Sequence, residues 1–258
     1  MIQNIIFGGQ LITQYYQKEI NVINSSVHTA IILAGGLGTR LRETVPNLSK
    51  PMAPILDRPF LEYQMDYWIK QGIDHFVLSV GYMKEVIVNH FGNSYCNVSI
   101  EYAVEDTPLG TGGGMLNAAQ DLTEPFIVLN GDTFFEVVLS DLNAFHQKQK
   151  SEWTLSLYRM NQAERYMGVE IDERGRILSM QSESLNMNSL ANGGVYLINP
   201  SVVNKFTKNM GKKTSLEDDL LPDFMSSGGE LFGMQFFGKF IDIGVAADYL
   251  SAEAILLQ

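Results

Sequence analysis

The chain has 258 residues, of which 45% are hydrophobic, so it can bury a substantial core and is most simply one domain. Its formal net charge of -11 argues against a nucleic-acid-binding surface, because a polyanion requires clustered Lys and Arg. No apolar run reaches the length of a membrane span, and a signal peptide is not expected at the N-terminus. The single cysteine, Cys96, permits no internal disulfide and fits a reducing cytoplasm.

Residues 1–28 precede the first predicted strand of the main domain and are interpreted as an N-terminal extension. Their apolar stretches, 5–7 and 11–16, could form a short hairpin or an arm that contacts a partner subunit. A homo-oligomer is therefore possible.

From residue 29 onward, apolar segments alternate with amphipathic ones, which is typical of βαβ units around a mostly parallel sheet. The expected strands are 29–33, 75–80, 98–103 and 125–129, and the expected helices are 60–71, 84–91, 112–120 and 140–150. Beyond residue 150 the sequence is richer in strands. There we expect strands at 153–160, 168–171, 176–180 and 195–199, a hairpin turn at 172–175, and helices at 202–208, 216–225 and 246–257.

A glycine-rich loop follows the first strand, in the stretch AIILAGGLGTRL at 30–41. Glycines at this position let backbone N–H groups approach an anion, and Arg40 and Lys50 supply positive charge for phosphate oxygens. The loop is not a P-loop, because no Lys-Ser or Lys-Thr pair follows its last glycine. It is not a dinucleotide fingerprint either, because Leu41 stands where a third glycine is needed.

Gly35, Gly36, Gly38, Arg40 and the pair Lys50-Pro51 together resemble the signature of the sugar-phosphate nucleotidyltransferases, also called nucleotide-sugar pyrophosphorylases. The resemblance extends from residue 29 to the C-terminus. It implies a single Rossmann-like α/β domain with a mostly parallel mixed sheet flanked by helices. A nucleotide-binding part would span about 29–150, and a β-rich sugar-binding part about 151–258. The nucleotide contacts that it implies in this loop are Leu33, Ala34, Gly35, Gly36, Gly38 and Thr39.

Asp132 follows a buried strand, at the carboxyl edge where open α/β sheets bind ligands. A carboxylate is a good ligand for Mg²⁺, which prefers few carboxylates plus phosphate oxygens. Taken alone, this residue could instead be a turn aspartate that caps the next segment. Asp242 also ends a short apolar run and precedes a glycine-containing turn. The resemblance implies that Asp132 and Asp242 hold one Mg²⁺, and that Arg40, Lys50 and Asp132 are catalytic.

Glu105 begins a second glycine-rich loop, EDTPLGTGGG at 105–114. A carboxylate only accepts hydrogen bonds, and guanine offers two adjacent donors on one edge, so Glu105 favours GTP. A solvent-exposed loop glutamate is the alternative. The resemblance adds Pro108, Gly110 and Thr111 as nucleotide contacts.

The sugar contacts implied by the resemblance are Asn130, Gly168, Glu183 and Asn192. Family members often carry a lysine directly after the glutamate of this set, whereas Ser184 follows Glu183 here, so no cation for the sugar phosphate is identified. The run Glu217-Asp218-Asp219 is interpreted as an acidic first helical turn, which the helix dipole favours.

The implied reaction joins a nucleoside triphosphate to a sugar 1-phosphate and releases pyrophosphate. The ionised sugar phosphate is the nucleophile, so catalysis rests on positioning and charge neutralisation. Within the family, the sequence is most similar to guanylyltransferases that act on D-glycero-α-D-manno-heptose 1-phosphate for bacterial surface polysaccharides. The segments that support this similarity are 50–54, 108–113, 129–135, 192–196 and 240–245.

Three alternatives stay open at this point. A transferase of uridylyl, thymidylyl or guanylyl groups to glucose or mannose 1-phosphate would keep the phosphate and metal residues. A metal-dependent glycosyltransferase would be expected to carry Asp-x-Asp, where this chain has Asn130-Gly131-Asp132. A non-catalytic subunit that senses nucleotide-sugars would be expected to have lost Arg40, Lys50 or an aspartate, and all are present.

Overall fold

The computed structural model describes residues 27–36, 48–159, 168–181, 189–244 and 246–256. The elements of the first half are β1 (Thr29–Leu33), β2 (Pro54–Ile55), β3 (Arg58–Pro59), α2 (Phe60–Lys70), β4 (His75–Val80), α3 (Lys84–Phe91), β5 (Ser94–Tyr95), β6 (Val98–Val104), α4 (Gly110–Ala119), β7 (Phe126–Asn130), β8 (Thr133–Phe135) and α5 (Leu139–Gln149). A 3₁₀ turn at Lys50–Met52 precedes β2.

The elements of the second half are β9 (Trp153–Arg159), β10 (Gly168–Ile171), β11 (Ile177–Gln181), β12 (Leu190–Ile198), α6 (Pro200–Lys205), α7 (Leu221–Ser226), β13 (Leu231–Gln235), β14 (Phe240–Asp242) and α8 (Ala246–Leu256). A 3₁₀ turn at Thr207–Asn209 follows α6, and a π-helical turn at Leu216–Leu220 leads into α7.

One large mixed sheet runs through both halves in the order β11-β10-β12-β7-β1-β4-β6-β5, with β9 and β13 branching from β12. Its central strands β7, β1, β4 and β6 are parallel to one another. The chain passes from β1 to β4 and β6 on one side and then returns to place β7 on the other side of β1. The ends of β1 and β7 therefore flank a topological switch point, where ligands bind in open α/β sheets.

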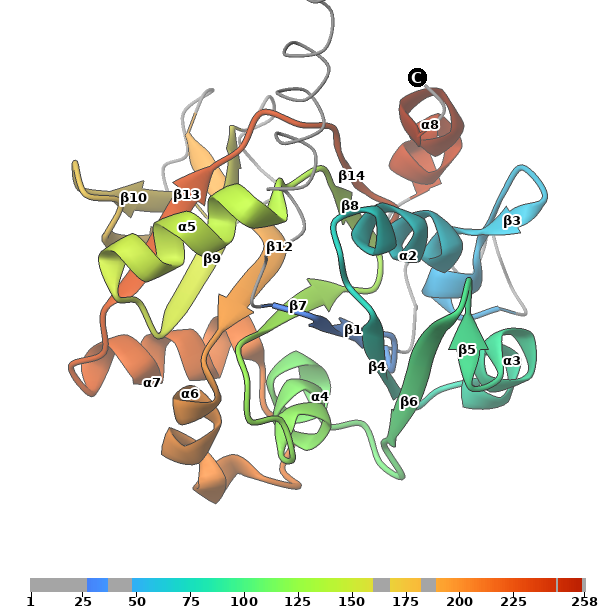
Figure 1. The fold of residues 1–258 in the computed structure, drawn as a ribbon, viewed down its shortest axis with the longest axis horizontal. Coiled ribbons are helices and arrows are strands. Elements are labelled where there is room, and N and C mark those ends of the chain that lie inside the picture. The colour runs from blue at the N-terminus through green and yellow to red at the C-terminus, as the bar shows by residue number, and fades with distance from the viewer. Residues whose placement is uncertain (1–26, 37–47, 160–167, 182–188, 245, 257–258) are drawn as a thin grey trace, which may run out of the picture.

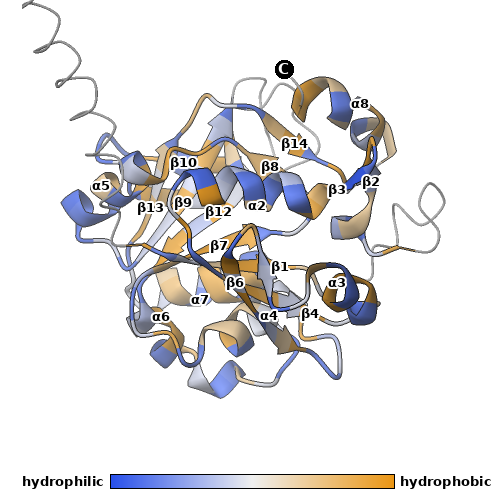
Figure 2. Ribbon diagram, turned by 45° about the vertical axis from the view of Figure 1, so that its right-hand side comes forward, coloured by the Kyte–Doolittle hydropathy of each residue, from blue (hydrophilic) through white to orange (hydrophobic). Residues whose placement is uncertain are grey.

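Helices cover both faces of this sheet (Figure 1). On one face, α2, α3 and α5 contribute to a core that includes Leu61, Trp68, Ile87 and Leu142. On the other face, α4, α6 and α7 pack over a second core around Trp153 and Phe224. Figure 2 shows the hydrophobic colour concentrated on the central strands, as expected for strands that are buried on both faces.

The predicted α/β fold with a mostly parallel sheet is confirmed, and most predicted elements lie within one or two residues of their observed bounds. The main difference is β12, which begins at Leu190, earlier than predicted. Its pairing with β9 shifts between Asn192 and Tyr196, at two glycines that hide the strand pattern. The short strands β8 and β14 and the edge strand β13 were not predicted. The helix expected at 216–225 is a π-helical turn followed by α7.

None of the helices in the described part of the chain is long and apolar enough to cross a membrane.

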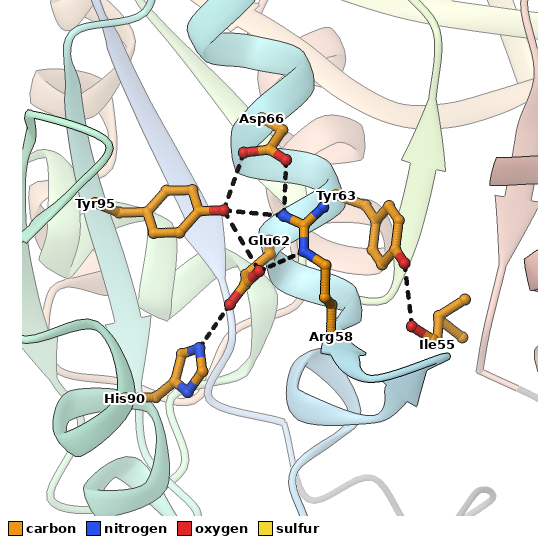
Figure 3. Close-up of polar contacts among 7 residues, drawn as sticks. All are labelled: Ile55, Arg58, Glu62, Tyr63, Asp66, His90 and Tyr95. Carbon is orange, nitrogen blue, oxygen red and sulfur yellow. Dashed lines mark hydrogen bonds and ion pairs between the residues drawn. The ribbon is translucent and has the colours of Figure 1, made fainter. Parts of the chain in front are cut away.

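A cluster of charged residues fixes α2 against its neighbours (Figure 3). Arg58 donates from Nε to Glu62 Oε2 and from Nη2 to Asp66 Oδ2, each at 2.7 Å. Its Nη2 also donates to the Tyr95 hydroxyl, and His90 lies 2.8 Å from Glu62 Oε1. Hydrogen bonding to Asp66 and then to Glu62 raises the pKa of Arg58. The cluster therefore ties β3, α2, α3 and β5 together.

The pKa of Glu62 is lowered from its ordinary value of 4.5 in this cluster. Burial alone would raise this pKa, but the hydrogen bonds that Glu62 accepts from His90 and Arg58 lower it by more. A lowered folded pKa means that the stabilisation is present above the unfolded pKa and is lost as the pH falls through the folded pKa.

We expect Arg58→Met to lower the free energy of unfolding by about 1 kcal/mol near neutral pH, because two carboxylates lose a shared cation that is partly exposed. The difference in unfolding free energy between wild type and variant should shrink as the pH falls below 4.5, the ordinary pKa of Glu62. A protonated Glu62 no longer gains from the charge of Arg58, so wild type loses its advantage. Urea unfolding across this pH range measures it. Arg174→Met, at an exposed position in the hairpin turn, is the matched control. A deficit that is equal at acidic and neutral pH would contradict the electrostatic explanation.

Candidate active site

A cavity of about 500 Å³ lies at the carboxyl ends of β1 and β7, within the size range of small-molecule sites. It is lined by Leu33, Ala34, Gly35, Gly36, Lys50, Pro51, Glu105, Pro108, Gly110, Thr111, Asn130, Gly131, Asp132 and Lys213. Residues from both glycine-rich loops, the end of β7 and the segment after α6 thus meet at the switch point.

The close approach of β1 and β7 builds the floor of this cavity. Gly131 N donates to Leu33 O at 3.2 Å, directly beyond the last paired residues of the two strands. A Cβ atom at position 131 would overlap Leu33 O, so only glycine fits there without a shift. On the other side of β1, Ala34 N donates to Ser79 O at 2.8 Å. The main chain after β1 is therefore held between its two neighbouring strands.

Asp132, Asp242 and Lys50 converge beside Gly244. Lys50 Nζ donates to Asp132 Oδ2 at 2.9 Å, and Gly244 N donates to Asp242 Oδ1 at 2.7 Å. A Cβ atom built on Gly244 would lie 2.7 Å from Asp242 Oδ1, 3.3 Å from Lys50 Nζ and 3.4 Å from Asp132 Oδ2. The antiparallel pairing of β8 with β14 brings the aspartates together, because it sets Asp242 opposite Thr133.

Gln64 fixes the segment that carries Asp132, a role that the sequence did not suggest. This α2 side chain is 1% exposed, and its Nε2 donates to Asn130 O at 2.9 Å and also to Thr133 O. The two carbonyls lie on either side of Gly131-Asp132. One buried amide therefore fixes the bend that aims Asp132 at the cavity.

Glu105 lies at the cavity wall with both carboxylate oxygens engaged. Ser79 Oγ donates to its Oε1 at 2.7 Å, and Leu109 N donates to its Oε2 at 2.9 Å. The interpretation of Glu105 as a solvated loop residue is therefore wrong. Each carboxylate oxygen can still accept a further hydrogen bond, and its orientation is already fixed.

Thr214 holds Leu109 and the first turn of α4, which begins at Gly110 within the predicted second glycine-rich loop. Its backbone N donates to Leu109 O at 2.8 Å, and its backbone O accepts from Gly112 N at 2.9 Å and from Gly113 N at 3.1 Å. Two first-turn amides of α4, those of Gly112 and Gly113, are thus already bonded within the protein. Lys213, beside Thr214, lines the cavity and supplies a cation that the sequence analysis did not identify.

A chain of polar side chains runs behind the cavity wall, from Thr111 through Glu217 to Tyr196 and Asn192. Burial raises the pKa of the Tyr196 phenol well above its ordinary value, and the nearby charge of Glu217 adds to this effect. The interpretation of Glu217 only as an acidic residue that the helix dipole favours is therefore incomplete. Asp218 and Asp219 do lie at the first turn, where Ser215 N donates to Asp219 Oδ2 and Asp218 N donates to Ser215 Oγ.

The predicted site residues divide into three groups. Most of the nucleotide, catalytic and metal residues, together with the predicted sugar contact Asn130, line or adjoin the cavity. Gly168 and Asn192 are not in its lining, although Gly168 pairs with Ala191, next to Asn192. Gly38, Thr39, Arg40 and Glu183 lie outside the described residues, so their roles stay predictions.

Residues 29–258 match the family model described as "Nucleotidyl transferase". The D-glycero-alpha-D-manno-heptose 1-phosphate guanylyltransferase of Aneurinibacillus thermoaerophilus is 41% identical over 226 residues, which cover 87% of this chain and 96% of that protein. The protein of the same name from Campylobacter jejuni is 39% identical over 220 residues, covering 85% of this chain and 96% of its own length.

Among solved structures, HddC from Yersinia pseudotuberculosis superposes with a TM-score of 0.76 at 30% identity, covering 88% of this chain and 99% of that chain. A second structure of that protein, complexed with GMP-PN, superposes with a TM-score of 0.75.

We expect Gly131→Ala to lower the free energy of unfolding by about 1–3 kcal/mol, because a methyl group at this position forces β7 away from β1. Urea unfolding measures the loss. Gly36→Ala is the matched control, since a Cβ atom there meets nothing within 4 Å. Equal stability of the two variants would show that the strand ends do not need this close contact.

Proposed function

The chain belongs to the nucleotidyl transferase family, and we propose that it transfers the GMP group of GTP to D-glycero-α-D-manno-heptose 1-phosphate, giving GDP-heptose and pyrophosphate. It is a sugar-1-phosphate nucleotidyltransferase. The observation that carries the proposal is the cavity at the switch point, which Glu105, Lys50 and Asp132 line and which Asp242 adjoins. The similarity to two heptose 1-phosphate guanylyltransferases at about 40% identity supports the choice of substrates.

Glu105 is the residue that would select guanine. N1–H and the 2-amino group of guanine are adjacent donors, and a carboxylate presents two adjacent acceptors. Ser79 and Leu109 hold this carboxylate in place before the nucleotide binds. Fixed acceptors discriminate well, because a base without both donors leaves one carboxylate oxygen without the second hydrogen bond that guanine supplies.

The chemistry requires positioned charges rather than a general base, because the sugar phosphate is already ionised at neutral pH. Lys50 would neutralise phosphate oxygens at the reacting side. Lys213, which lines the same cavity, would supply the second cation there, in place of the lysine that is absent after Glu183. Arg40 and the amides of the first glycine loop are predicted to hold the departing pyrophosphate.

Asp132 and Asp242 fit a divalent cation. Both carboxylates approach the same point beside Gly244, and two hard oxygen ligands plus phosphate oxygens suit Mg²⁺. When bound, the ion would supply Lewis-acid charge neutralisation of the phosphate oxygens. Members of this family are typically metal-dependent. Lys50 forms an ion pair with Asp132 and so balances the charge of one of the two acids.

A role in bacterial surface-polysaccharide synthesis is part of the proposal, because GDP-heptose is an activated sugar for such polymers. A cytoplasmic location and a homo-oligomeric state stay predictions.

The test of the function is pyrophosphate release with Mg²⁺, crossing GTP, UTP, dTTP, CTP and ATP with heptose, mannose and glucose 1-phosphates. We expect release with GTP and the heptose phosphate. Turnover with UTP or dTTP and a hexose phosphate would keep the reaction class but show that Glu105 does not select guanine. No release in any combination would contradict a catalytic function and favour a sensing subunit.

We expect Asp132→Asn to lower kcat/KM by about 10³-fold or more, because one of the two metal-binding carboxylates is lost from the reacting centre. Calorimetric titration with Mg²⁺ should show weaker binding, while the melting temperature changes little because the side chain keeps its shape. Asp121→Asn, at an exposed position after α4, is the matched control. A near-normal rate in Asp132→Asn at ordinary Mg²⁺ would contradict the assignment.

A further inference from the structure

Glu217 bonds to hydroxyl groups from two different parts of the fold. Its Oε2 accepts from Thr111 Oγ1 at 2.9 Å, at the first turn of α4. Its Oε1 accepts from the Tyr196 hydroxyl at 2.9 Å, near the C-terminal end of β12. Thr111 Oγ1 in turn accepts from Leu216 N at 2.8 Å, which fixes the direction in which its own proton is donated.

Tyr196 extends this chain toward the predicted sugar contacts. Its side chain is completely buried, and its hydroxyl oxygen accepts from Asn192 Nδ2 at 2.7 Å. The Asn192 amide donates to the phenol oxygen, so the Tyr196 proton goes to Glu217. Asn130 packs beside the same part of β12, because its Nδ2 lies 3.0 Å from where a Cβ atom on Gly194 would stand.

One end of this network, Thr111, lines the cavity. The other end, Asn192, lies two residues before Gly194, which packs against the side chain of the cavity residue Asn130. Asn192 Oδ1 accepts from Gly194 N at 3.1 Å, which fixes the irregular part of β12. Glu217 itself is not in the cavity lining, so it acts on the site through these neighbours.

We propose that Glu217 is a positioning residue, which holds the nucleotide-binding Thr111 in a fixed relation to the sugar-side residues Asn130 and Asn192. This inference rests on the proposed function, which places the two substrates in one cavity. A carboxylate is required because the central residue must accept from two hydroxyl groups at once. A glutamine offers one acceptor oxygen and turns an NH₂ group toward the other hydroxyl.

The expected consequence is a loss in turnover rather than in binding. In-line attack depends on the alignment of two bound substrates, and small displacements of aligned groups can cost about 10²-fold in rate. Each substrate keeps its own direct contacts when Glu217 is changed. The network therefore contributes to kcat more than to KM.

The kinetic test compares Glu217→Gln with wild type and with Asp223→Asn, a nearby acid exposed on α7. We expect Glu217→Gln to lower kcat about 10–100-fold with both KM values within about threefold, while Asp223→Asn matches wild type. Combining Glu217→Gln with Tyr196→Phe should cost much less than the product of the two single losses, because both break the same network. An unchanged kcat, with or without a lower melting temperature, would overturn the proposal.

A second measurement separates this inference from the proposed function. In ¹H–¹⁵N spectra of the full chain, Glu217→Gln should shift the Gly194 amide, which Tyr196 and Asn192 connect to Glu217, whereas Asp223→Asn should not. An unmoved Gly194 amide would overturn the network. Absence of pyrophosphate release by wild type would contradict the proposed function and the catalytic part of this inference, while a shift would still support the positioning geometry.

Discussion

The close approach of the ends of β1 and β7 is the constraint on which the site depends. Parallel pairing brings the two strand ends side by side, and Gly131 lets the main chain of one contact Leu33 O of the other. Because β7 returns on the opposite side of β1 from β4, this contact lies at the switch point of the sheet. Residues 34–36 after β1 and the carboxylate of Asp132 then line one cavity. Gln64 maintains this arrangement from α2, by bonding carbonyls on both sides of Asp132.

The site places positive side chains in its cavity, although the whole molecule is strongly negative. The chain carries a formal net charge of -11, yet its proposed substrates are polyanions. Lys50 and Lys213 come from different segments and both line the cavity. The carboxylates Asp132 and Asp242 add negative charge beside them, which is unfavourable for phosphate binding unless a cation occupies the point where they converge. The ion pair of Lys50 with Asp132 balances part of this charge.

The sequence predicted the parts of this site that depend on neighbours in the chain. A buried strand followed by glycines or by an aspartate is a local pattern. The glycine-rich loop after β1 and Asp132 after β7 were both identified from this pattern. Gln64, Lys213 and Glu217 carry no such pattern, because their roles arise from contacts with residues far away in the sequence. Strands of two or three residues are likewise too short to show alternation, so the β8–β14 pair, which brings Asp132 and Asp242 together, was not foreseen.

The second glycine-rich loop belongs to the first half of the chain but is held by residues of the second half. The two halves therefore do not each serve one substrate alone. All four residues from Gly110 to Gly113 are glycine or threonine. Such a segment has few side chains that could make stabilising contacts. Its rigidity comes from Thr214, which bonds three of its backbone groups from the second half of the chain. Lys213 enters the cavity as the neighbour of this residue. The second half therefore shapes the proposed base-binding loop as well as the sugar side, so the position of one substrate is tied to the position of the other.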